Sequence, residues 1–278
     1  MAAIASSVSA PARTDPAAGH ADFVVFQDLV VEFGAGEWTV RALDRVSLSF
    51  GRGDFVCVVG PSGCGKTTML QTLAGFLQPT AGSVTIEGSP CGPPGPDRGV
   101  VFQQPALYPW MTVTANASFG PRMRKMPKAE ISETVTYYLK MTGLWEFRQR
   151  YPYELSGGMQ QRLAIVRALV NHPRLLLMDE PFGALDALTR EKMQEELHAV
   201  WKRTGMTVLF ITHSVEEAVY LGTEVVVMSP RPGRVLERLS APFAHDAGER
   251  NSRAIKSGPD FVATRERVLS LIWGMAHD

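Results

Sequence analysis

Apolar and polar residues alternate along the first third of the chain in a way that predicts strands. Phe23–Phe33 and Thr39–Phe50 carry alternating and apolar runs that are typical of an antiparallel sheet. Phe55–Val59 is a continuous apolar run, which indicates a buried strand. Two shorter strands are expected at Ser83–Glu87 and Gly99–Phe102, on either side of a loop rich in glycine and proline.

Helical spacing dominates the middle of the chain. One helix is expected from Lys66 to about Leu77, with its leucines on one face. The pattern becomes helical again from Val113 to about Tyr151, and another helix with a single apolar stripe follows Ser156. We therefore expect a helical subdomain at about residues 113–170, inserted into an α/β body.

Strands and helices alternate in the second half of the chain. The expected elements are a strand at Leu175–Met178, a helix at Thr189–Arg203, a strand at Thr207–Ile211, a helix at Val215–Leu221 and a strand at Glu224–Met228. This alternation produces a parallel sheet with crossover helices. The predicted fold class is α/β, with a mostly parallel core sheet, an N-terminal antiparallel β subdomain and the inserted α-helical subdomain.

The two ends of the chain have a different character. Residues 1–20 are rich in Ala, Ser and Pro and predict a disordered tail, since they lack the basic start and apolar block of a signal peptide. The main domain is expected at residues 21–240. A C-terminal extension at 241–278 follows the strand expected at Arg234–Leu239, and it is expected to be polar until a short amphipathic segment around Val268–Met275.

Composition narrows the functional class. Lys and Arg together number 28, as do Asp and Glu, and this balance argues against nucleic-acid binding. No run approaches the roughly 18 apolar residues of a membrane span, so work at a membrane would require a partner's span. The spacing of Cys57, Cys64 and Cys91 fits no zinc or redox pattern, which favours reduced thiols.

A phosphate-binding loop follows the strand at Phe55–Val59. The run is Gly60, Pro61, Ser62, Gly63, Cys64, Gly65, Lys66 and Thr67, with Thr68 next, and it matches the P-loop pattern of glycine, four residues and Gly-Lys-Ser/Thr. Glycines let the backbone N–H groups turn toward phosphate oxygens, and the helix that follows adds its dipole. Lys66 is expected to reach the β- and γ-phosphates of ATP, and the Thr67 hydroxyl to bind Mg²⁺.

Two carboxylates stand at the end of another apolar strand. Asp179 and Glu180 directly follow Leu175–Met178. In a P-loop fold an Asp at such a position holds Mg²⁺, so Asp179 is a candidate metal residue. Glu180 is then placed to polarise the water that attacks the γ-phosphate.

A second anion site is predicted at Ser156, Gly157 and Gly158. A Ser-Gly-Gly sequence that opens a helix offers exposed N–H groups, a hydroxyl donor and a dipole end. On its own it could equally be an ordinary N-cap with a glycine turn. One chain has no use for two γ-phosphate cradles on one nucleotide, unless they face different nucleotides.

Together and in this order, these motifs resemble the nucleotide-binding subunit of an ABC transporter. Leu155–Gln160 is similar to the signature of that family, and the resemblance covers roughly Phe23 to Arg238. It implies a P-loop NTPase fold and ATP hydrolysis with Mg²⁺. It also implies a head-to-tail dimer in which the P-loop of one subunit and the signature of the other enclose each ATP.

The resemblance assigns further residues one by one. Gln103 matches the glutamine that touches Mg²⁺ and the water, and His213 matches the switch histidine at the γ-phosphate. Asp186 matches the loop that contacts the other subunit, and Phe33 matches the aromatic residue that stacks on adenine, with Trp38 as its competitor. The implied catalytic residues are Lys66, Gln103, Glu180 and His213.

Narrower stretches resemble the nitrate/sulfonate/taurine importer branch of the family. They are Asp97–Gln103, Tyr108–Val113, Met178–Arg190 and Ser229–Arg234. The branch implies permease subunits, an extracytoplasmic solute-binding protein and a peripheral place at the cytoplasmic face of the inner membrane. Around Tyr108, Pro109 and Trp110, docking of the permease and core packing of Trp110 are equally open.

Two other functions compete with transport. One is a soluble ABC ATPase that acts on DNA or ribosomes, but such chains usually carry a long coiled-coil insertion or a duplicated ATPase, and the chain holds a single motif set. The other is a non-catalytic nucleotide-binding module, which the presence of Glu180 and His213 disfavours.

Overall fold

The computed structural model of the chain describes residues 22–246 and 252–275. The tail predicted at residues 1–20 lies outside the described residues. The strands are β1 (Asp22–Phe33), β2 (Val40–Gly51), β3 (Phe55–Val59), β4 (Ala81–Ile86), β5 (Ser89–Pro90), β6 (Arg98–Val101), β7 (Leu175–Asp179), β8 (Thr207–Ile211), β9 (Glu224–Met228) and β10 (Val235–Ser240). The α-helices are α1 (Lys66–Ala74), α2 (Val113–Met123), α3 (Lys128–Met141), α4 (Gly157–Leu169), α5 (Ala187–Thr204), α6 (Val215–Leu221), α7 (Phe243–Asp246), α8 (Ser252–Lys256) and α9 (Pro259–Gly274).

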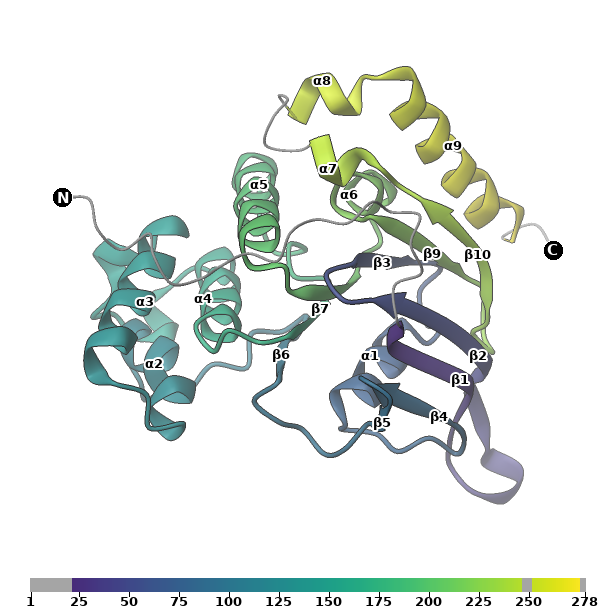
Figure 1. The fold of residues 1–278 in the computed structure, drawn as a ribbon, viewed down its shortest axis with the longest axis horizontal. Helices are drawn as coiled ribbons and strands as arrows, with labels where there is room; N and C mark the ends of the chain where they lie inside the picture. Colours follow the sequence, from purple (N-terminus) through teal and green to yellow (C-terminus); the bar gives the residue numbers. More distant parts are fainter. Residues whose placement is uncertain (1–21, 247–251, 276–278) are drawn as a thin grey trace.

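Two sheets form the body, as the sequence predicts. The larger sheet has the order β10-β9-β3-β8-β7-β6, and its pairs are parallel except for β10 with β9. The smaller sheet has the order β2-β1-β4-β5 and is antiparallel. Figure 1 shows the smaller sheet beside α1, and α2 and α3 at the opposite side of the molecule.

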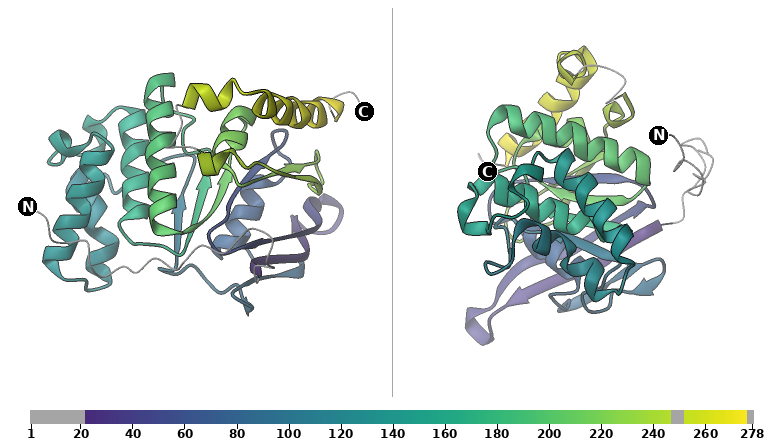
Figure 2. Two further views of the ribbon diagram at one scale, coloured as in Figure 1. Left: turned by 45° about the horizontal axis from the view of Figure 1, so that its top comes forward. Right: turned by 90° about the vertical axis from the view of Figure 1, so that its left-hand side faces the viewer.

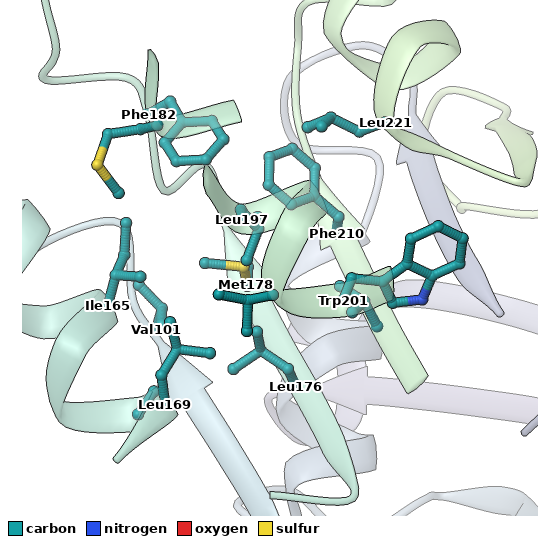
Figure 3. Close-up of a cluster of buried hydrophobic side chains, with 14 of the residues drawn as sticks. Val101, Ile165, Leu169, Leu176, Met178, Phe182, Leu197, Trp201, Phe210 and Leu221 are labelled. Atoms are coloured by element: carbon teal, nitrogen blue, oxygen red, sulfur yellow. The ribbon is translucent and has the colours of Figure 1, made fainter. Parts of the chain in front are cut away.

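The central strands of the large sheet, β3, β7, β8 and β9, are buried on both faces. In β8, Leu209 and Ile211 join the apolar cluster that includes α1 and the small sheet, while Val208 and Phe210 join the cluster that includes α4, α5 and α6. The same alternation places Met178 and Leu176 of β7 beside Phe210 in the second cluster (Figure 3). Because side chains of a strand alternate between faces, continuous apolar runs are what a sheet covered on both faces requires.

Helix α1 is shorter than the sequence pattern predicts. It ends at Ala74 rather than near Leu77, because Gly75 adopts a left-handed conformation with φ +84° and its N–H bonds to the carbonyl oxygens of Gln71 and Thr72. This is a glycine C-cap, and it ends the helix although apolar residues continue beyond it.

The stretch beyond β10 is more ordered than expected. Its described residues form α7, α8 and α9, and the amphipathic segment expected around Val268–Met275 is longer than predicted, because α9 begins at Pro259. Figure 2 shows α9, in yellow, running along the outside of the molecule. Phe261 and Val268 of α9 are fully buried in the cluster that contains residues of α6. The sequence pattern missed this because only a narrow stripe of α9 is apolar, and its partner α6 is distant along the chain.

Among the helices that the structure describes, none combines the length and the apolar character needed to cross a membrane.

Candidate functional site

The phosphate loop connects β3 to α1. Gly65, directly before α1, has φ +97°, and a Cβ atom added to it would lie 2.5 Å from Leu43 Cδ2. Only glycine fits this conformation and this space. The first N–H groups of α1 have no partner within the helix, and together with the helix dipole they favour an anion in front of Lys66.

Lys66 and Thr67 are oriented by hydrogen bonds at the start of α1. The buried Lys66 donates from Nζ to the carbonyl oxygens of Gly60 (2.8 Å) and Pro61 (3.0 Å). Thr67 Oγ1 donates to Asp179 Oδ2 at 2.8 Å. The ammonium group is thus held within the loop, and the hydroxyl of α1 is joined to the end of β7.

The two carboxylates at the end of β7 lie in different environments. Asp179 is 5% exposed, and burial raises its pKa while the Thr67 hydrogen bond opposes that shift. Glu180 has φ +45°, a conformation that side chains rarely adopt, and its N–H donates to Ile211 O at 2.9 Å. Backbone strain of this kind costs about 1–3 kcal/mol and persists where surrounding structure enforces it, which is common at functional sites.

Gln103 and His213 converge on Glu180. Gln103 Nε2 donates to Glu180 Oε2 at 3.1 Å, and His213 Nδ1 lies 3.3 Å from the same oxygen. The three residues follow β6, β7 and β8, which are neighbours in the parallel sheet. Since carboxyl ends of parallel strands share one edge, the topology brings together residues that are far apart in sequence.

A pocket of about 450 Å³ lies over the phosphate loop. Of the residues predicted from sequence, its lining includes Phe33, Ser62, Gly63, Gly65, Lys66, Thr67, Thr68, Gln103 and Glu180. Phe33 is 44% exposed at its rim, whereas Trp38 is 85% exposed and is not among the lining residues. The geometry therefore favours Phe33 over Trp38 as the residue beside a bound base.

Other predicted residues lie behind or beside this pocket. Cys64 takes part in the loop through its backbone, while its side chain is buried in the core cluster of α1. Gly60 and Pro61 contribute the carbonyl oxygens that hold Lys66. Asp179 lies below Thr67, and His213 reaches the site through Glu180.

The Ser-Gly-Gly segment forms a separate surface. Ser156 caps α4, its Oγ accepting from Met159 N at 3.3 Å, and Ser156 and Gly157 are exposed. A Cβ atom on Gly158 would lie 3.2 Å from Leu185 Cδ2, so this helix start adjoins the loop that ends at Asp186. None of these residues lines the phosphate-loop pocket.

Asp186 is exposed and caps α5. Its Oδ1 accepts from Thr189 N at 3.0 Å, and this hydrogen bond lowers the pKa of Asp186. The Ser156 surface and the Asp186 loop are thus one contiguous region, and the structure leaves both open to solvent.

Three residues that line or support the pocket were not predicted from sequence. They are Val40 and Ala42 of β2 and Arg231, which line the pocket. The segment Ser229–Arg234 was noted only for its resemblance to the importer branch, and Arg231 was not assigned to the nucleotide site. No local sequence signal pointed to Arg231, because it reaches the pocket only through the parallel pairing of β9 with β3, whose carboxyl ends share an edge.

The loop that carries His213 rests on a buried carboxylate. Glu217 of α6 accepts hydrogen bonds from the Thr212 hydroxyl and from Gln194 Nε2 of α5, and burial raises its pKa. Ser214 N donates to Thr212 Oγ1 at 3.0 Å, which fixes the turn around His213.

In the aromatic segment after Gln103, Tyr108 packs against neighbouring side chains, whereas Trp110 is exposed. The Tyr108 ring lies 4.7 Å from the Phe119 ring and is covered by the Arg167 guanidinium. Trp110 is 70% exposed, so the alternative that it packs in the core is wrong. An exposed tryptophan beside Tyr108 is available for contact with another molecule.

The donors at the phosphate loop suit Mg²⁺ shared with a nucleotide. They are the Thr67 hydroxyl, an Asp179 carboxylate and the Gln103 amide, and hard cations prefer oxygen ligands. Within residues 22–246 and 252–275, no group of three or more His, Cys, Asp or Glu could hold a metal ion. A metal here would take its remaining ligands from phosphates and water, as Mg²⁺ commonly does.

The fold and the site define a P-loop nucleotide-binding protein with a second glycine-rich helix start, at Ser156, outside the pocket. Residues 43–183 match the family model described as ABC transporter, and the chain belongs to this family.

Relatives with curated names are similar over most of the chain. The taurine import ATP-binding protein of Pelagibacter ubique is 50% identical over 240 residues, covering 86% of this chain and 91% of the relative. The protein of the same name from Chromobacterium violaceum is 52% identical over 231 residues, covering 82% and 88%.

Solved structures share the fold. An ATP-binding cassette described as a dimer in a post-hydrolysis state, bound to ADP and Pi, has a TM-score of 0.72 and 32% identity, covering 78% of this chain and 98% of the other. A subunit of an ABC transporter complex from Clostridium perfringens has a TM-score of 0.70 and 26% identity, covering 88% and 99%. The chain is therefore an ABC ATPase subunit that binds and hydrolyses ATP.

Proposed function

We propose that this chain powers the import of taurine or a chemically similar sulfonate by hydrolysing ATP while bound to a membrane permease. The observation that carries the cargo is the similarity to taurine import ATP-binding proteins, 50% over 86% of the chain. The cassette itself does not touch the cargo, so its residues support the ATPase but not the choice of solute.

We assign nucleotide binding to the pocket over the phosphate loop. Phe33 stacks on adenine, which its exposed ring at the rim permits. Gly60–Thr68 cradle the phosphates, with Lys66 at the β- and γ-phosphates. Thr67, Asp179 and Gln103 hold Mg²⁺, which when bound neutralises charge on the phosphate oxygens.

Hydrolysis is assigned to the group around Glu180. The Glu180 carboxylate accepts the proton of the attacking water, because it stands at the edge where Gln103 and His213 converge. Gln103 orients that water through its amide, and His213 donates toward the γ-phosphate once it turns from Glu180. The strained backbone of Glu180 supports this role.

Two copies of the chain are needed for a complete site. Ser156, Gly157 and Gly158 are exposed or half-buried and lie outside the chain's own pocket. We infer that they bind the γ-phosphate held by a second copy, with Asp186 at the contact between the copies. The dimeric state of a structural relative supports this arrangement.

The permease contact is assigned to the exposed surface at Tyr108, Pro109 and Trp110. The proposed complex places the chain at the cytoplasmic face of the inner membrane. An extracytoplasmic solute-binding protein acts on the cassette only through the permease.

Reconstitution tests this function. The chain is purified together with its permease and combined with the solute-binding protein, and ATP hydrolysis is measured in proteoliposomes. Taurine-loaded binding protein is expected to stimulate hydrolysis several-fold over the ligand-free protein, and Trp110→Ala to reduce the stimulation while leaving basal hydrolysis unchanged. Stimulation by nitrate but not by any sulfonate would reject the cargo, and hydrolysis without permease dependence would reject the transport role.

A further inference from the structure

The loop Ser229–Arg234, directly after β9, is rigidly closed on itself. Ser229 N donates to Arg234 O at 2.9 Å, and Arg234 N donates to Ser229 Oγ at 3.0 Å. The same hydroxyl donates to the carbonyl oxygens of Pro230 and Pro232. The loop is therefore a compact turn held by its own hydrogen bonds rather than a flexible connection.

The loop is also tied to β2. Gly233 N donates to Ala42 O at 2.9 Å, and Asp44 N donates to Gly233 O at 3.0 Å. The Arg234 guanidinium pairs with the carboxylate of Asp44, which is only 2% exposed. Arg234 is thus a structural anchor, with its charge neutralised.

The phosphate loop packs against this segment backbone to backbone. A Cβ atom on Gly233 would lie 1.9 Å from Cys64 O, and one on Gly60 would lie 2.8 Å from Met228 O. Such close approach leaves no room for relative movement. The backbone of the loop, including the Cα atom of Arg231, is therefore held next to the phosphate loop.

Arg231 is carried at the tip of this loop and lines the pocket. Its Nη2 would lie 3.4 Å from a Cβ atom on Gly63, so the guanidinium lies against the phosphate loop. Unlike Arg234, it has no hydrogen bond or ion pair with any residue that the structure describes. A free arginine held at an anion-binding loop is available to a ligand.

We propose that Arg231 is a second phosphate-binding cation of the ATP site, acting beside Lys66. The triphosphate carries several negative charges, and a guanidinium offers two parallel N–H donors to phosphate oxygens. Lys66 approaches from within the loop, bonded to Gly60 and Pro61, whereas Arg231 approaches from the side of Gly63. The two cations thus contact the phosphates from different directions.

Binding measurements on the full chain test this role. Arg231→Gln is expected to raise the Kd for ATP and for inorganic tripolyphosphate about tenfold, since one charge-assisted contact is lost. Arg231→Lys is expected to restore part of the affinity. Arg45→Gln is the matched control, because Arg45 is exposed and lies 3.9 Å from Asp44 without lining the pocket, and its Kd is expected within twofold of wild type.

Three results would overturn the proposal. One is an unchanged Kd for ATP in Arg231→Gln. Another is a loss for ATP without a loss for tripolyphosphate, which would place the guanidinium on the base. The third is a loss only at protein concentrations where dimers form, which sedimentation reveals and which would place Arg231 at the subunit contact. The melting temperature of each variant is measured, and an unchanged value is expected because Arg231 is exposed.

Discussion

The phosphate-loop pocket and the Ser156 surface both begin with glycines at a helix start, yet they differ in what surrounds them. At the pocket, the buried Lys66 donates to carbonyl oxygens of the phosphate loop, and the buried Asp179 behind it accepts from Thr67 of α1. At the other surface, Ser156 and Asp186 bond only to the first turns of their own helices and face solvent. One region is assembled by the fold of a single chain, whereas the other is exposed and, in our proposal, is completed by a second copy of the chain.

Among variants that test this comparison, the largest effect is expected at Glu180. Glu180→Gln is expected to reduce ATP turnover at least 100-fold, because loss of a general base costs about 10²–10⁴-fold in rate. Binding of ATP is expected to remain within about threefold of wild type, and ATP-bound dimers are expected to accumulate because ATP is no longer consumed. Phosphate release and size-exclusion chromatography measure the two effects, and near-normal turnover would remove Glu180 from the role of base.

Ser156→Arg tests whether the second surface serves another copy. Turnover is expected to fall about 100-fold, while the Kd of the monomer for ATP stays unchanged, since the pocket does not include Ser156. A matched loss of ATP binding by the monomer would contradict the division into two half-sites.

Ser156→Asp distinguishes the role of Ser156 as a helix cap from its proposed contact with phosphate. Asp caps helices as well as Ser does, so stability is expected to change by less than about 1 kcal/mol. Turnover is still expected to fall strongly, because a carboxylate repels the γ-phosphate. Urea unfolding and steady-state hydrolysis on the same protein make the distinction, and normal turnover in this variant would leave Ser156 as a cap alone.

Replacing Glu217 and Glu216 compares how much a buried and an exposed carboxylate contribute to stability. Glu217→Ala leaves the Thr212 hydroxyl and the Gln194 amide without their acceptor, and it is expected to destabilise the fold by about 2–3 kcal/mol. Glu216→Ala removes only an exposed ion pair with Lys256, worth less than about 1 kcal/mol. Urea unfolding measures both, and equal effects would show that Glu217 does not hold the His213 loop.

Replacing Phe33 or Trp38 is expected to have the smallest effect of these variants, and it is measured on ATP binding. Phe33→Ala is expected to weaken ATP binding about three- to tenfold, the size of one aromatic stacking contact. Trp38→Ala is expected to leave the Kd within twofold, because Trp38 lies outside the pocket lining. The reverse order in titrations with ATP would transfer the stacking role to Trp38.

Much of the fold was predictable because the apolar periodicity of each element is strong. The strand Thr207–Ile211, the helix Val215–Leu221 and the strand Glu224–Met228 were predicted with their observed bounds. The end of α1 and the helices beyond β10 were not, because a left-handed Gly75 and the burial of Phe261 against α6 depend on local conformation and distant partners. Motifs with fixed spacing, such as Gly60–Thr67, could be recognised without knowledge of distant contacts, because the residues that form them are neighbours in the sequence.

The sequence alone determined the chemical groups of this protein: a phosphate loop, a pair of carboxylates after a strand, and a second glycine-rich helix start at Ser156, in family order. These features reside in short segments, where residue type and spacing are sufficient. Only the tertiary structure decided which groups meet. It joined Gln103, Glu180 and His213 at one sheet edge, excluded Ser156 from the chain's own pocket, and placed Arg231 against the phosphate loop. The reason is that parallel strand order, which no local pattern encodes, decides which loops share an edge.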